Sequence, residues 1–70
     1  MNVGDIVVLN EAGISCYNRN IKDKSIKPGK EMTIIKYRGF DNGRDIYEVE
    51  CDGKTDVYFQ YCLKSVNHLI

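Results

Sequence analysis

Apolar and polar positions of this 70-residue chain alternate in short runs that glycine-containing dipeptides separate. From Val3 to Leu9 the chain is rich in β-branched residues, which fit the pleated surface of a strand, and we expect a first strand there. Residues 10–30 show no sustained period and contain the only proline, so we expect a long loop, with at most a short irregular strand pair inside it. A loop of that length in a compact domain is usually functional, which makes it the first candidate surface.

The second predicted strand follows a proline turn. Pro28-Gly29 suits a type II turn, in which proline fixes φ and glycine accepts the positive φ of the next position. The strand formers that come next predict a strand from Glu31 to Arg38. Residues 39–45 are expected to end this strand, and Asn42-Gly43 within them is the strongest short hairpin signal in the sequence.

A third strand is predicted from Ile46 to Cys51, where the alternation is clean. Tyr47 and Val49 share a face with Cys51, and we expect that face to point toward the core. Asp52-Gly53 is a second hairpin turn and joins this strand to the next one along the chain.

The fourth predicted strand covers Thr55 to Gln60. Val57 and Phe59 share one of its faces. The other face carries Asp56, Tyr58 and Gln60. We therefore expect Tyr58 to lie at least partly outside the core.

The last segment, residues 61–66, suits one tight helical turn that runs into a short closing strand, and residues 67–70 are expected to fray. The chain is long enough for one domain only, which we assign to residues 1–70. The order of elements predicts an all-β fold, a small half-open barrel of five strands with a long first loop and a one-turn helix before the last strand.

Several short segments carry a resemblance at the level of the fold. They are Val3-Gly4-Asp5-Ile6-Val7-Val8-Leu9, Pro28-Gly29 before Met32 to Ile35, Tyr47-Glu48-Val49 ahead of Asp52-Gly53, and Val57 with Leu63 to Val66. By type and order these segments, which cover most of the chain, resemble the Src-homology-3-like small barrel of short bacterial and phage accessory proteins and of KOW-type modules. The resemblance implies the fold and no particular activity. The chain lacks the tryptophan of the members that bind proline-rich peptides, and it lacks the basic balance of the KOW modules that bind nucleic acid.

Charge is unevenly distributed although the net charge is zero. Residues 19–38 hold seven basic and two acidic side chains, a balance of +5, whereas residues 41–56 hold two basic and six acidic ones, a balance of −4. On separate faces these segments would attract charged partners, and interleaved they would neutralise each other and favour only solubility. The candidate contacts for an anion or a nucleic acid are Arg19, Lys22, Lys24, Lys27 and Lys30. The simpler interpretation is a solvated loop.

Aromatic residues provide a second candidate surface. In barrels of the kind resembled, partners usually meet the long first loop, the loop between the second and third strands, and the one-turn helix. That resemblance implies a shared patch, in which tyrosine provides a large apolar area with a polar tip. The candidate partner-binding residues are Tyr17, Phe40, Tyr58 and Tyr61. The alternative is that these rings cover the core of a domain that has few large apolar side chains.

The remaining chemistry is sparse. Three cysteines, an odd number without C-x-x-C spacing, predict free thiols in a reducing compartment. Cys62 and His68 lack an orienting third group for nucleophilic catalysis, and the ligand types do not suffice for a zinc site. We expect no enzyme activity, no cofactor and no metal. The chain shows neither a signal peptide nor a membrane-spanning segment, and we expect a cytoplasmic protein.

Three functional hypotheses remain. The first is a non-enzymatic protein-interaction module, an accessory protein of phage or bacterial type that binds and modulates a larger partner protein. The second is a nucleic-acid-binding barrel that uses the basic residues between 19 and 38. The third is an oligomer that binds a small molecule or nucleotide between its copies. The sequence leaves the partner and the oligomeric state open.

Overall fold

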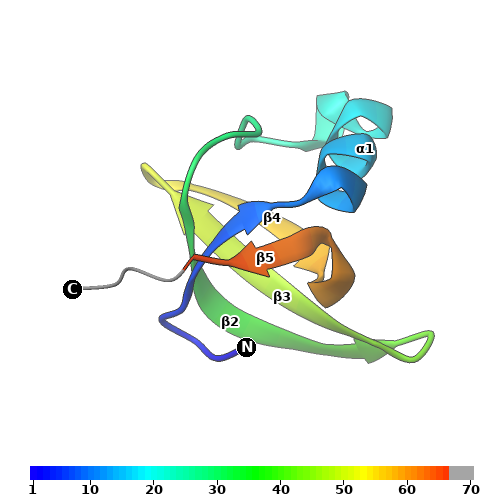
Figure 1. The fold of residues 1–70 in the computed structure, drawn as a ribbon, viewed down its shortest axis with the longest axis vertical. Helices are drawn as coiled ribbons and strands as arrows, with labels where there is room; N and C mark the ends of the chain where they lie inside the picture. Colours follow the sequence, from blue (N-terminus) through cyan, green and yellow to red (C-terminus); the bar gives the residue numbers. More distant parts are fainter. Residues whose placement is uncertain (67–70) are drawn as a thin grey trace.

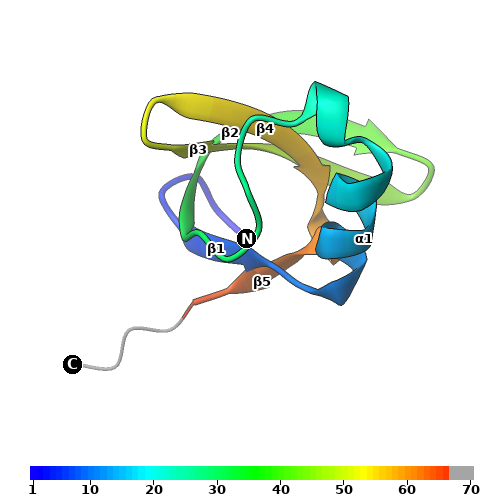
Figure 2. The same ribbon diagram turned by 90° about the horizontal axis from the view of Figure 1, so that it is seen from above.

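Five antiparallel strands form one bent sheet in the computed structural model, which describes residues 1–66 (Figure 1). The strands are β1 (Ile6–Leu9), β2 (Met32–Asp41), β3 (Arg44–Cys51), β4 (Lys54–Phe59) and β5 (Leu63–Ser65). Their order is β4-β3-β2-β1-β5, so the first strand of the chain pairs with the last. The sheet bends so that β1 and β5 lie across from β3 and β4 (Figure 2), but its two edge strands do not pair and the sheet is not closed.

The expectation of a long loop over residues 10–30 is wrong in its first half. A helix α1 (Glu11–Arg19) and a 3₁₀ turn η1 (Ile21–Asp23) occupy this segment, so the chain is mostly β and not all-β. Asn10 caps the helix, because its side-chain oxygen accepts from the amide of Gly13 at 2.9 Å. Only Gly13 of the helix is fully buried, while Cys16 and Tyr17 are partly buried against the core, so the face that α1 turns inward is too short and too weakly apolar to predict a helix.

Both predicted hairpin turns are confirmed. Asn42 and Gly43 have φ of 52° and 76°, and Asp52 and Gly53 have φ of 52° and 79°, the positive values that type I′ turns require. The predicted break over residues 39–45 is too wide, because β2 runs on to Asp41 and β3 begins at Arg44. Two register shifts in β2, one between Ile34 and Lys36 and one between Tyr37 and Gly39, absorb the irregular pattern of this strand without ending it.

The predicted orientation of the fourth strand is also wrong. A two-residue turn at Asp52-Gly53 sets Tyr58 opposite Tyr47 and Asp56 opposite Val49. Directly opposed residues of antiparallel strands share a face, so Tyr58 and Asp56 point to the core, where they are 2% and 6% exposed. Val57 points outward instead.

The core lies inside the bend of the sheet. Its fully buried side chains are Met32, Ile34, Val7, Val49 and Cys62. Tyr47 and Val49 face this core as the alternation predicted, and Cys51 on the same face is half-buried. The predicted one-turn helix is confirmed as η2 (Gln60–Cys62), which runs directly into β5. The expected fraying of residues 67–70 lies outside the described residues.

The hydroxyl of Tyr58 is buried and has no hydrogen-bond partner within residues 1–66. Because an unpaired buried hydroxyl opposes folding, Tyr58→Phe should raise the free energy of unfolding by up to about 1 kcal/mol, measured by urea denaturation. A clear loss of stability in this variant would contradict the assignment.

A pH dependence accompanies this prediction. Burial, and secondarily the Asp56 carboxylate, raise the pKa of Tyr58 above its ordinary value of 10.0. The folded state therefore holds the phenol proton more tightly than the unfolded chain, so the stability contributed by this proton is complete below about pH 10 and is lost as the pH rises further. The advantage of Tyr58→Phe over the wild type should widen above that pH.

Candidate functional site

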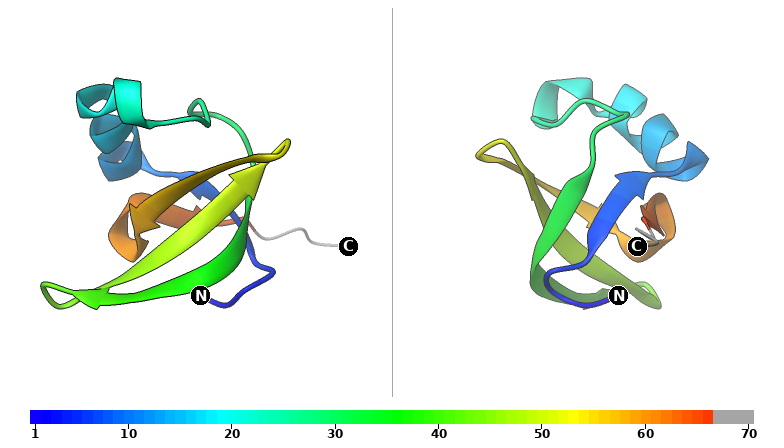
Figure 3. Two further views of the ribbon diagram at one scale, coloured as in Figure 1. Left: turned by 180° about the vertical axis from the view of Figure 1, so that it is seen from behind. Right: turned by 60° about the vertical axis from the view of Figure 1, so that its left-hand side comes forward.

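One end of the β2–β3 hairpin projects from the body of the domain. Among the described residues, β2 from Lys36 to Asp41 pairs with β3 alone, and β4 pairs with β3 only from Ile46 onward. Residues 37–45 therefore form a two-stranded projecting arm. η2 lies between this arm and α1 (Figures 1 and 3).

One charged side chain of the projecting arm, Arg44, contacts the one-turn helix η2. Phe40 lies opposite Asp45 in the strand register, and the hydroxyl of Tyr37 donates to Oδ1 of Asp45 at 2.9 Å. The Arg44 guanidinium lies 4.2 Å from the centre of the Tyr61 ring, a cation–π contact. These five residues are called the aromatic arm surface: Tyr37, Phe40, Arg44, Asp45 and Tyr61.

A hollow of ≈ 380 Å³ opens beside this surface. Its lining residues are Met1, Gly43, Arg44, Asp45, Gln60, Tyr61 and Leu63. The hydroxyl of Tyr47 donates to the backbone oxygen of Met1 at 3.1 Å and holds the N-terminal residue at the hollow. The hydrogen bond to the Asp45 carboxylate is the main cause that raises the pKa of Tyr37, so Tyr37 stays a neutral donor. The hollow thus combines apolar walls with one acidic and one basic group.

The rings of the aromatic arm surface are exposed. Phe40 is 68% exposed, Tyr37 48% and Tyr61 45%. None of the three belongs to the buried core. Tyrosine, phenylalanine and arginine are the residue types enriched at the centres of protein–protein interfaces.

Two of the four aromatic candidates taken from the sequence are exposed, Phe40 on the projecting arm and Tyr61 on η2, and no ring contact joins them within residues 1–66. Phe40 and Tyr61 belong to the aromatic arm surface, whereas Tyr58 is buried and Tyr17 on α1 is half-buried against the core. Sequence reasoning missed Arg44 as a site residue. Its position just after the Asn42-Gly43 turn was the available signal, because a two-residue turn places the flanking residues at the tip of a hairpin.

The basic candidates do not gather at one place. Lys24 donates to the backbone oxygen of Val57 at 2.8 Å and lies 4.0 Å from the centre of the Tyr58 ring. Arg19 ends α1, and Lys22 lies in η1. Lys27 and Lys30 line a different hollow, described below.

The positively and negatively charged segments of the sequence interleave in the fold. Arg38 on β2 pairs with Glu48 on β3 at 2.9 Å, and Lys30 lies 3.9 Å from Asp52 in the β3–β4 turn. The two segments therefore do not form separate positive and negative faces.

The side chains suited to metal and thiol chemistry are scattered over residues 1–66. No group of three or more His, Cys, Asp or Glu side chains is placed to hold a metal ion there, and none of the helices in that range is long and apolar enough to cross a membrane. The three cysteines are free thiols, with Cys62 buried and the other two half-buried. His68, considered above as a partner of Cys62, lies outside the described residues.

Comparisons of the chain with models of protein families, with curated proteins and with solved structures found no match.

Proposed function

We propose that this chain is a non-enzymatic protein-interaction module that binds a larger partner protein through the aromatic arm surface. We further propose that its architecture is a half-open barrel of the Src-homology-3-like type. The position of β1 between β2 and β5, and the one-turn helix η2 directly before β5, support this architecture.

The observation that carries the proposal is the exposure of large rings around one hollow: Tyr61 lines it, and Phe40 lies opposite Asp45, which also lines it. Phe40 and Tyr61 expose large apolar areas, and burial of such area against a partner is favourable by about 25 cal/mol per Å². A ring loses little side-chain entropy when it is fixed, which makes it an efficient contact residue. The hydrogen bond between Tyr37 and Asp45 ties the two strands of the projecting arm together and presents Phe40 on an ordered base.

The charged residues of the aromatic arm surface can orient a partner that binds to its rings. Tyr37 uses Oδ1 of Asp45, which leaves Oδ2 to accept from a donor of the partner. Arg44 stacks on Tyr61 and has no hydrogen-bond acceptor within residues 1–66, so its N–H groups can bind a carbonyl or carboxylate of the partner. The surface therefore suits a partner segment that places an apolar side chain between one donor and one acceptor.

The test compares variants that remove single rings. Wild-type chain immobilised on beads is used to capture partners from a lysate of the source cells, and a captured protein is then purified and titrated by calorimetry. Phe40→Ala and Tyr61→Ala should each weaken binding about tenfold, the usual cost of truncating a central interface residue.

Ile21→Ala is the matched control, because Ile21 is a 56% exposed apolar residue on η1 and lies outside the aromatic arm surface. Its affinity should stay within about twofold of the wild type. A partner that Phe40→Ala and Tyr61→Ala bind as tightly as the wild type would remove the aromatic arm surface from the proposal.

A further inference from the structure

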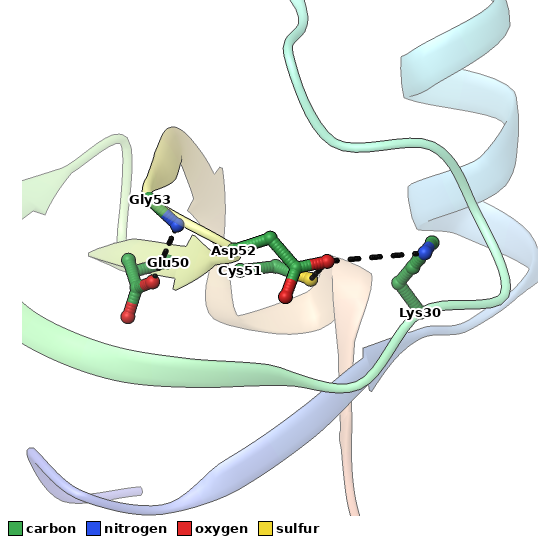
Figure 4. A network of polar contacts seen from close by, with 5 residues as sticks. All are labelled: Lys30, Glu50, Cys51, Asp52 and Gly53. Atoms are coloured by element: carbon green, nitrogen blue, oxygen red, sulfur yellow. Dashed lines mark hydrogen bonds and ion pairs between the residues drawn. The ribbon is translucent and has the colours of Figure 1, made fainter.

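A second hollow, of ≈ 310 Å³, lies between the segment that precedes β2 and the β3–β4 turn. Its lining residues are Ser25, Ile26, Lys27, Lys30, Cys51, Asp52 and Lys54. We call it the basic hollow. It shares no lining residue with the hollow of the aromatic arm surface. Figure 4 shows Lys30 from one wall reaching toward Asp52 and Cys51 on the other.

Both walls of the basic hollow are held by backbone hydrogen bonds. The buried Asp56 carboxylate accepts from the amides of Ser25, at 2.9 Å, and Ile26, at 2.8 Å. On the opposite wall the Glu50 carboxylate accepts from the amide of Gly53 at 2.9 Å and fixes the type I′ turn. The lysines therefore extend from an ordered backbone.

Positive charge at the basic hollow is only partly compensated. Lys30 and Asp52 are 3.9 Å apart, and both side chains are largely exposed, which makes this a weak ion pair. Lys27 and Lys54 form no ion pair within residues 1–66. Two further carboxylates, Glu50 and Asp56, lie beside the hollow and outside its lining; they keep their negative charge, although their oxygens accept from backbone amides. The lining residues themselves thus carry three lysines against one weakly paired carboxylate, a balance of +2.

We propose that the basic hollow binds a small anion that carries phosphate groups, with Lys27, Lys30 and Lys54 as its charge contacts. Lysine binds phosphate as a point charge, and three such charges around one hollow attract a multiply charged anion more strongly than a single phosphate. Ser25 lines the same space, and a serine hydroxyl is a neutral donor that can add to the charged contacts. The volume is at the lower end of the range for small-molecule sites, which fits a diphosphate group. This activity is separate from protein binding at the aromatic arm surface.

The experiment is a titration of the purified chain with sodium pyrophosphate at constant ionic strength, followed by ¹H–¹⁵N correlation spectra. Saturable shifts are expected at the amides of residues 25–30 and 51–54. Lys27→Gln and Lys54→Gln should each weaken binding about tenfold, since each removes one charge-assisted contact. Lys36→Gln and Lys64→Gln are matched controls at exposed lysines outside the hollow and should change the affinity less than twofold.

Cys51 gives a second measurement that does not depend on a substitution. Its thiol lines the basic hollow, whereas Cys16, also half-buried, does not. Bound pyrophosphate should slow alkylation of Cys51 by iodoacetamide and leave the rate at Cys16 unchanged, as read by mass spectrometry of the digested chain.

Inorganic phosphate, ADP and a single-stranded oligonucleotide form the other arms of the titration. Pyrophosphate and ADP should bind more tightly than phosphate. Shifts that do not saturate, or an equal loss of affinity in Lys36→Gln, would overturn the proposal. Oligonucleotide binding that Arg19→Gln and Lys22→Gln weaken as much as Lys54→Gln would assign the lysines to an extended nucleic-acid surface and would likewise overturn it.

Discussion

Replacing Asp56 with alanine is expected to lower the free energy of unfolding by about 3 kcal/mol, most of what a core of this size supplies. The Asp56 carboxylate is 6% exposed and accepts from two amides of the segment that precedes β2. Without it the buried amide of Ile26 has no acceptor, and the Ile26 side chain, 3% exposed, loses its anchor in the core. Urea denaturation followed by far-ultraviolet circular dichroism measures the loss.

Asp52→Asn is the matched control for this prediction, because asparagine tolerates the positive φ of 52° at this turn position as well as aspartate does. Asp52 is also an aspartate beside the basic hollow, but it is exposed and its ion pair with Lys30 is weak. Loss of its charge should change the free energy of unfolding by less than about 0.5 kcal/mol. Equal urea midpoints for Asp56→Ala and the wild type would show that the buried carboxylate does not hold this segment.

The second large effect is expected at Gly13, where alanine should lower the free energy of unfolding by about 2 kcal/mol. In an exposed helix the same change favours folding by about 1 kcal/mol, so the sign is informative. Here an added Cβ would collide with the backbone oxygen of Cys62 and lie 2.9 Å from a methyl group of Leu9. The Cys62 oxygen cannot move away easily, because it accepts from the amide of Asn10 at 3.0 Å. Overpacking of this kind outweighs the gain in helix propensity.

Ser15→Ala is the control that separates helix propensity from the close contact of Gly13 with Cys62. Ser15 lies exposed in the same helix, and alanine there should raise the free energy of unfolding by about 0.4 kcal/mol. If Gly13→Ala also stabilised the protein, the close approach of α1 to η2 would be wrong. Thermal and urea denaturation of both variants distinguish these results.

The hairpins were predictable because their signal is local. Asn42-Gly43 and Asp52-Gly53 specify turns whose positive φ values few other residue pairs adopt at low cost. The length of the Asp52-Gly53 turn also specifies which face of β4 points to the core. A two-residue turn after Cys51 requires Val49 to face Asp56 and Tyr47 to face Tyr58. The error at Tyr58 came from interpreting the strand by its own alternation and not by its register with β3.

The candidate sites were predictable only in part. Residue type was enough to single out Phe40 and Tyr61, yet the contact of Tyr61 with Arg44 on the projecting arm depends on η2 folding back beside that arm. The basic residues of the sequence segment were also visible, but Lys54 joins Lys27 and Lys30 from a different hairpin. Contacts between residues so far apart along the chain cannot be obtained from spacing.

The sequence by itself determined the strands, both type I′ turns and the one-turn helix, because backbone preferences and alternation act over a few residues. Only the tertiary structure decided that α1 forms and which lysines converge. The helix α1 buries only Gly13 fully and packs Cys16 and Tyr17 partly against the core, so its stability comes from the Asn10 cap and from tertiary contacts with η2 and the core. The Asp56 carboxylate is a further instance, since its two amide donors lie about thirty residues earlier in the chain. Local patterns are compatible with several tertiary arrangements of these elements, and contacts between residues far apart in the chain decide which one forms.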